Sequence, residues 1–100
     1  MLYRDARMET YRSTHVTLDD PCQVRVEDGV ITVEYTSDGE PVIYKGHEKG
    51  PGHYELHAVG FDGRATLHTF DGSALLEGGW TEEGAKGMWR IWLRRDCLRD

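Results

Sequence analysis

The fold of this chain is decided between residues 52 and 94, which read GHYELHAV (52–59), GRATLHTF (63–70), SALLEGGW (73–80) and KGMWRIWLR (86–94). In each run apolar residues alternate with polar ones, the period of two that is typical of a strand with one buried face. Glycine-containing turns separate the runs. The stretch therefore predicts four antiparallel strands joined by hairpins.

The alternation continues toward the N-terminus in shorter runs near residues 16–18, 24–26, 31–35 and 42–44. Asp28-Gly29 and Asp38-Gly39 stand between such runs and predict hairpins, because these residues accept the positive φ of a tight turn. Asp19-Asp20-Pro21 predicts the end of a strand, since proline cannot continue a central strand. The whole pattern amounts to eight strands in a meander.

The hairpin registers are mutually consistent. The expected pairs, which put one apolar face on the same side of successive strands, are Val26–Ile31, Val33–Tyr44, Ala58–Ala65, Leu56–Leu67, Leu67–Leu76 and Trp80–Trp89. A slip of one residue in any hairpin would send that strand's apolar set to the other side.

We therefore predict an all-β, eight-stranded antiparallel meander that closes into an up-and-down barrel, because closure removes both edge strands; a sandwich is the alternative. The predicted domains are an N-terminal arm or extension (1–12), one barrel (13–96) and a C-terminal tail (97–100). Residues 1–12 show no clear period and are compatible with a short helix, a mobile arm or a strand extension.

The chain has 100 residues and a formal charge of −6, so it is expected to be one acidic domain. The charge argues against a general binder of phosphate backbones, which needs a basic stripe, and we expect no nucleic-acid partner. No signal-peptide pattern and no apolar run of membrane-spanning length occurs, which favours a cytoplasmic protein. We expect a monomer or a weak dimer. Cys22 and Cys97 are predicted at opposite ends of the barrel and therefore free.

The strand meander resembles the calycin-type barrels, meaning lipocalins and avidins, at the level of architecture. The resemblance implies a small ligand held inside the barrel. The lipocalin Gly-x-Trp signature belongs on the first strand, whereas Gly78-Gly79-Trp80 lies on the seventh predicted strand here.

Three groups of side chains and one outward-facing pair are candidates for a site. The first is a set of inward-facing aromatic residues that would line a pocket for a flat ligand or simply form the core: Tyr35, Tyr44, Tyr54, Trp80 and Trp89. The second is an acidic rim made of Asp19, Asp20, Asp38, Glu40, Asp62, Glu82 and Glu83, beside Lys86, where a cationic ligand or basic protein would bind. Ordinary turn chemistry explains the same carboxylates.

Trp92 and Arg90 are expected to face outward together. They form either a partner-binding hot spot or a stacked pair, with Glu77 as a further partner for Arg90. The third group is His53, Glu55 and His57 on one strand face, with His68 expected across from Glu55; these are ligands that zinc favours, or else ordinary exposed residues of the outer wall.

No nucleophile motif or phosphate loop occurs, so we predict no catalytic residue and no cofactor. The leading hypothesis is a non-enzymatic barrel that holds a small ligand in an aromatic interior with an acidic mouth. The alternatives are an acidic interaction module or inhibitor for a basic protein, and a divalent-metal-dependent enzyme.

Overall fold

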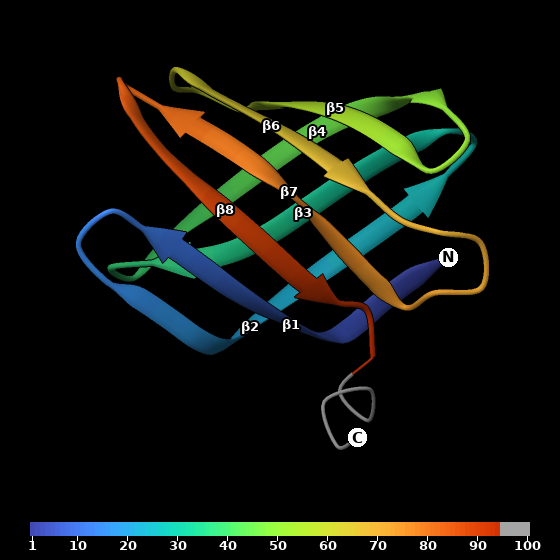
Figure 1. Ribbon diagram of the computed structural model, residues 1–100, viewed down its shortest axis with the longest axis horizontal. Helices are drawn as coiled ribbons and strands as arrows, with labels where there is room; N and C mark the ends of the chain where they lie inside the picture. The colour runs from blue at the N-terminus through green and yellow to red at the C-terminus, as the bar shows by residue number, and fades with distance from the viewer. Residues whose placement is uncertain (95–100) are drawn as a thin grey trace.

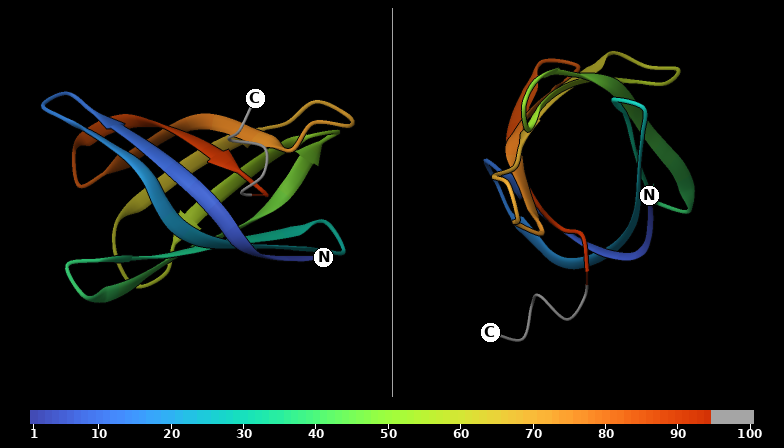
Figure 2. Two further views of the ribbon diagram at one scale, coloured as in Figure 1. Left: turned by 90° about the horizontal axis from the view of Figure 1, so that it is seen from below. Right: turned by 90° about the vertical axis from the view of Figure 1, so that its right-hand side faces the viewer.

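The computed structural model describes residues 1–94 as an all-β chain whose eight antiparallel strands close into a barrel in meander order (Figure 1). Figure 2 shows the strands as a closed ring when the barrel is viewed end-on. The predicted fold class is confirmed, and the barrel rather than the sandwich is formed. The strands are β1 (Leu2–Arg12), β2 (Val16–Glu27), β3 (Val30–Ser37), β4 (Glu40–Gly50), β5 (His53–Ala58), β6 (Gly63–His68), β7 (Leu75–Glu82) and β8 (Ala85–Trp92). Within residues 1–94 no helix is long and apolar enough to cross a membrane.

The first twelve residues are part of the barrel, so of the possibilities left open for them it is a strand that is formed, and the barrel begins before residue 13. Strand β1 pairs with β2 on one side and with β8 on the other, and it closes the ring. Its period is hidden in the sequence because the β1–β2 pairing shifts register between Tyr3 and Ala6, and because the buried positions that follow, Ala6, Met8 and Thr10, include a small and a polar residue. Such irregularities interrupt the simple alternation from which a strand is predicted. The predicted tail, residues 97–100, lies outside the described residues.

Strand β2 runs through Pro21, where the sequence predicted a break. Pro21 pairs with Arg7 of β1, while the ladder between β2 and β3 begins only at Cys22. Pro21 therefore has a ladder partner on one side only, a position equivalent to an edge strand, which is where sheets tolerate proline. The number of strands is eight, as predicted, for a different reason. The two short strands expected within residues 16–26 form the single strand β2, and β1 is an additional strand.

The registers set by Asp-Gly turns are confirmed, with Val26 opposite Ile31 and Val33 opposite Tyr44. The three later hairpins differ from the prediction by two residues. Leu56 faces Ala65, Ala65 faces Trp80, and Leu76 faces Ile91. A shift of two residues keeps every side chain on its predicted side of the sheet, so the apolar face survives the error.

The core is built from these inward residues, and the largest completely buried side chains are those of Trp89 and Tyr44. Their rings meet edge to face, with centroids 4.9 Å apart. Inward glycines allow close approach of backbones: a Cβ added at Gly78 would overlap the carbonyl oxygen of Thr66 on β6, and one at Gly46 would overlap that of Glu55 on β5. These two positions exclude any other residue.

We expect Gly78→Ala to destabilise the barrel by about 3 kcal/mol or more, because the methyl group meets backbone that cannot move without breaking the ladder. Gly79→Ala is the matched control, since the nearest atom to its Cβ is 3.5 Å away. Urea unfolding followed by tryptophan fluorescence measures both. Equal midpoints for the two variants would contradict the close approach.

Candidate functional site

The two ends of the barrel differ in how they are filled. The connections β1–β2, β3–β4, β5–β6 and β7–β8 lie at one end, named here the closed end, on the left of Figure 1. The connections β2–β3, β4–β5 and β6–β7 lie at the other, the open end, together with the N-terminus. Inside the barrel, space for a ligand is expected only at one of these ends, since an eight-stranded barrel is just wide enough for side chains to fill.

The closed end is packed with side chains. The hydroxyl of Tyr44 donates a hydrogen bond to Glu82, and Phe61 lies edge-on against the Tyr44 ring at 5.8 Å. A Cβ added at Gly63 would lie 2.6 Å from the Tyr44 hydroxyl oxygen. Desolvation and the Glu82 contact raise the pKa of Tyr44 well above its usual range. Nothing enters the barrel from this end without displacing these groups.

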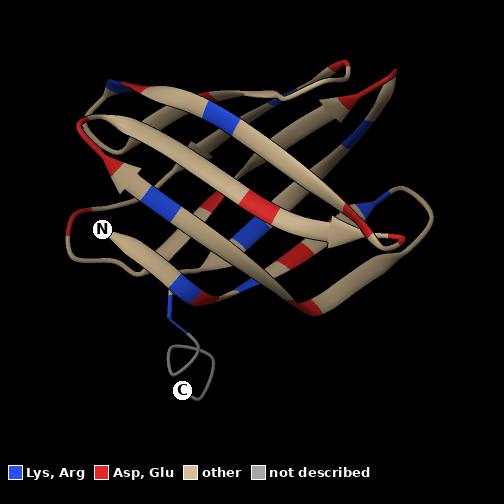
Figure 3. Ribbon diagram, turned by 180° about the vertical axis from the view of Figure 1, so that it is seen from behind, with Lys and Arg blue, Asp and Glu red and all other residues tan. Residues whose placement is uncertain are grey.

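The acidic rim is smaller than predicted. Asp38, Glu40, Asp62, Glu82 and Glu83 do lie at or beside connections of the closed end, where Glu83 N–H donates to the carbonyl of Asp62 over 3.1 Å. Asp19 and Asp20, which were expected in the first connection, lie within β2 instead. Asp19 forms an ion pair with Arg7 at 3.7 Å. In Figure 3, acidic positions occupy several of the turns at the barrel ends, whereas most basic positions lie along strands.

The predicted ligand-binding aromatic residues face inward, but most of them are core. Tyr44 and Trp89 have 0% and 1% of their surface exposed, so they border no space wide enough for a water molecule. Trp80 donates its indole N–H to the Met88 carbonyl over 3.3 Å, and Tyr35 lies edge-on to Trp89 at 6.1 Å. Burial, with the nearby Glu82, raises the pKa of Tyr35 to about 12. Only Tyr54 borders a hollow at the open end.

The open end contains a hollow of about 680 Å³. Figure 2 (right) looks toward this end of the ring. Its walls are inward-facing residues near the ends of four strands, Tyr3, Val26, Tyr54 and Leu76, together with Leu93, which directly follows β8. The β6–β7 loop borders it with Thr69, Phe70 and Ser73, and Phe70 is 85% exposed. Sequence reasoning identified Tyr54 but missed the others, because their common position at one barrel end depends on the shifted registers.

The predicted metal-ligating residues do not form one cluster. His68 faces His53, with their Nδ1 atoms 2.6 Å apart, and not Glu55 as expected. Glu55 lies opposite Thr66, and His57 lies opposite Arg64. Within residues 1–94, no group of three or more His, Cys, Asp or Glu side chains is placed to hold a metal ion.

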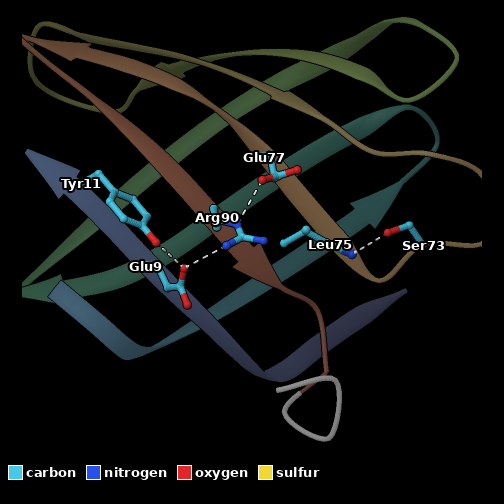
Figure 4. Close-up of polar contacts among 6 residues, drawn as sticks. All are labelled: Glu9, Tyr11, Ser73, Leu75, Glu77 and Arg90. Carbon is cyan, nitrogen blue, oxygen red and sulfur yellow. Dashed lines mark hydrogen bonds and ion pairs between the residues drawn. The ribbon is translucent and has the colours of Figure 1, made fainter. Parts of the chain in front are cut away.

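Arg90 and Trp92 do face outward together, and Arg90 is already engaged. Its guanidinium lies 5.5 Å over the Trp92 ring, and its Nε is 3.0 Å from Glu77. Figure 4 shows it between Glu77 of β7 and Glu9 of β1. Tyr11 donates to Glu9 over 2.8 Å, which raises the pKa of Tyr11. The stacked, ion-paired arrangement that was the alternative for Arg90 is thus present.

The Cys22 thiol is free and buried. Burial, with the nearby Asp20, raises its pKa to about 12, so the thiol is protonated and unreactive at neutral pH. Cys97 lies outside the described residues.

No protein-family model, curated protein or solved structure matches this chain. The resemblance to calycin barrels therefore rests on strand number and order alone.

The raised tyrosine pKa values predict a loss of stability at alkaline pH. An unfolded tyrosine ionises near pH 10, whereas folded Tyr35 keeps its proton to about pH 12. The folded state binds more protons in this window, so stability is intact below about pH 10 and falls as the pH rises toward 12. Urea midpoints measured across this range test it.

Tyr35→Phe is the variant that isolates this effect. It should reduce the alkaline loss without removing it, because Tyr44 also has a raised pKa. A wild-type midpoint that stays constant across the window would refute the prediction.

Proposed function

We propose that this protein is a non-enzymatic binding protein that takes a small, largely apolar ligand into the open end of its barrel. The observation that carries the proposal is the hollow of about 680 Å³ walled by inward-facing residues at the open ends of the strands and by Leu93 beyond β8. Ligand pockets of this kind have volumes of roughly 300–1,000 Å³ and occur at the mouths of β-barrels.

The chemistry of the hollow suits a ligand with an apolar body and a polar edge. Val26, Leu76 and Leu93 supply apolar contact. The hydroxyls of Tyr54 and Thr69 and the carboxylate of Glu48 supply polar groups at its border. Such a lining binds the apolar part of the ligand by burying its surface, and a few polar contacts orient the ligand.

Phe70 supports the same proposal. An aromatic ring that is 85% exposed leaves apolar surface in water, and covering such a side chain contributes about 1.5–3 kcal/mol. Phe70 also borders the hollow, so a ligand there would gain this contact. This differs from a single apolar residue scattered on the surface, which needs no explanation.

The proposed position of the ligand differs from the aromatic interior expected from the sequence. Tyr54 is 9% exposed and Leu76 only 2%, and beyond them the interior is filled by the core. The ligand would therefore rest on these two residues at the end of the barrel and stay accessible to solvent on one side.

Binding without chemistry is favoured by the residues around the hollow. Its described lining contains hydroxyls and the carboxylates of Glu48 and Asp71, but neither histidine nor cysteine. A hydroxyl nucleophile needs an adjacent base to become reactive. The one thiol among residues 1–94, that of Cys22, is buried elsewhere in the core.

The fluorescent apolar probe 1-anilinonaphthalene-8-sulfonate tests the proposal. We expect one probe per chain and a several-fold weaker affinity in Phe70→Ala, with an unchanged melting temperature because this ring packs against little. Leu18→Ala is the matched control, since Leu18 is also exposed, at 62%, but lies on β2 away from the hollow. Equal weakening by both substitutions, or no binding by the folded wild type, would overturn the proposal.

A further inference from the structure

The outer wall of the barrel contains a continuous row of basic and hydroxyl side chains. Following the register from strand to strand, each residue lies directly opposite the next: Arg25, Thr32, Lys45, His57, Arg64, Thr81 and Lys86. We name this set the basic row. It crosses β2 to β8 at right angles to the strands, with a Lys or Arg on every second strand.

The basic row is a positively charged part of the surface on a protein whose net charge is negative. It contains four of the twelve Lys and Arg residues and none of the eighteen Asp and Glu residues. The four cationic side chains belong to exposed residues and form no ion pair or side-chain hydrogen bond with any described residue. Free, aligned cations of this kind produce a local positive potential even where the net charge is negative.

Two hollows lie along the row. The larger, of about 740 Å³, extends across β5 to β8 beside Arg64 and Lys86, and Gly79, Gly87 and Met88 form part of its surface. It exists partly because Gly79 faces outward without a side chain. The smaller, of about 360 Å³, lies across β4 and β5 beside Lys45 and His57. The hollows therefore combine apolar surface with cationic side chains at their borders.

We propose that the basic row binds single-stranded nucleic acid. Adjacent strands are about 4.8 Å apart, so cations on alternate strands are about 10 Å apart along the wall. A single-stranded nucleic acid alternates anionic phosphates with flat bases, which matches this arrangement. Its phosphates would contact Lys45, Arg64 and Lys86, and a base would lie over Gly79 and Met88.

The curvature of the wall favours single-stranded over double-stranded nucleic acid. The row follows a closed barrel and is convex, so a ligand that touches several of its cations must bend around it. A duplex is stiff over about 150 base pairs, whereas a single strand adjusts freely. Glu55 borders both hollows and is the one acid in either lining, so it opposes binding.

The net charge of −6 led us to expect no nucleic-acid partner, because the sequence contains no visible basic stripe. The four cations are widely separated along the chain, and only the strand registers bring them into line. The proposal is independent of the ligand at the open end, which lies among inward-facing residues.

Fluorescence anisotropy with a labelled oligothymidylate of about 15 nucleotides, a length within the usual site size, tests the proposal. Three contacted phosphates predict that log K falls with log salt with a slope of about −2, at about −0.7 per contact. Lys45→Gln, Arg64→Gln and Lys86→Gln should each reduce the slope by about 0.7. Arg4→Gln, an exposed cation on β1 outside the row, should leave the slope unchanged.

Two further variants distinguish the row from general charge. Glu55→Gln should strengthen binding, because it removes the opposing carboxylate. Gly79→Leu should weaken binding several-fold at an unchanged salt slope, because it fills the floor and keeps every cation. A Cβ at this outward position makes only ordinary contacts, the nearest at 3.5 Å. Circular dichroism establishes that each variant is folded.

Three results would overturn the nucleic-acid proposal. If Arg4→Gln matches Arg64→Gln, the attraction is not localised on the row. If polyglutamate or heparin binds while the oligonucleotide does not, the row serves an acidic peptide or a sulfated chain, and the nucleic-acid proposal fails. Absence of all binding by the folded wild type at about 50 mM salt would end it as well.

Discussion

The ladder between β1 and β8 is the constraint on which the rest of the structure depends. Six residue pairs, from Arg7–Trp92 to Arg12–Gly87, join the first strand of the chain to the last. Once they form, every strand has two neighbours and no open edge remains. A strand then cannot slip by one residue without exposing its apolar set and breaking ladders on both sides. The ion pair of Arg90 with Glu9 lies across this seam, and the pair with Glu77 joins β8 to β7. Both add little by comparison, since exposed pairs contribute about 0–1 kcal/mol.

Closure also decides where space is left inside. The interior is filled by Trp89, Tyr44 and their neighbours, and the closed end is sealed because Tyr44 and Glu82 satisfy each other there. At the open end the final inward residues are not covered by a similar contact, and the β6–β7 loop stands beside them. The asymmetry between the ends, rather than the width of the barrel, provides the candidate site.

The same closure orders the outer wall. Side chains that face out from successive strands fall into rows perpendicular to the strands, because antiparallel pairing places them directly opposite one another. One such row is basic, although the chain is acidic as a whole. Charge on this protein is therefore arranged by face, and composition alone does not reveal it.

The amino-acid sequence by itself determined the all-β class, the strands β3 to β8 and the inward side of most of them, because period-two alternation is a local property of the chain. It also determined the β2–β3 and β3–β4 registers, since a two-residue Asp-Gly turn leaves one way to pair the flanking strands. It did not reveal β1, whose register shifts hide the period, or the continuity of β2 through Pro21, which depends on a missing neighbour.

Only the tertiary structure decided which inward aromatic residues leave room for a ligand. Tyr44 and Tyr54 look alike in the sequence, but one is enclosed by other rings and the other borders the hollow. It also decided that His68 meets His53 and not Glu55, because a two-residue change of register preserves the face and changes the partner. The alignment of Lys45, Arg64 and Lys86 has the same origin: side chains far apart in the chain become neighbours through strand pairing, and no local pattern encodes that pairing.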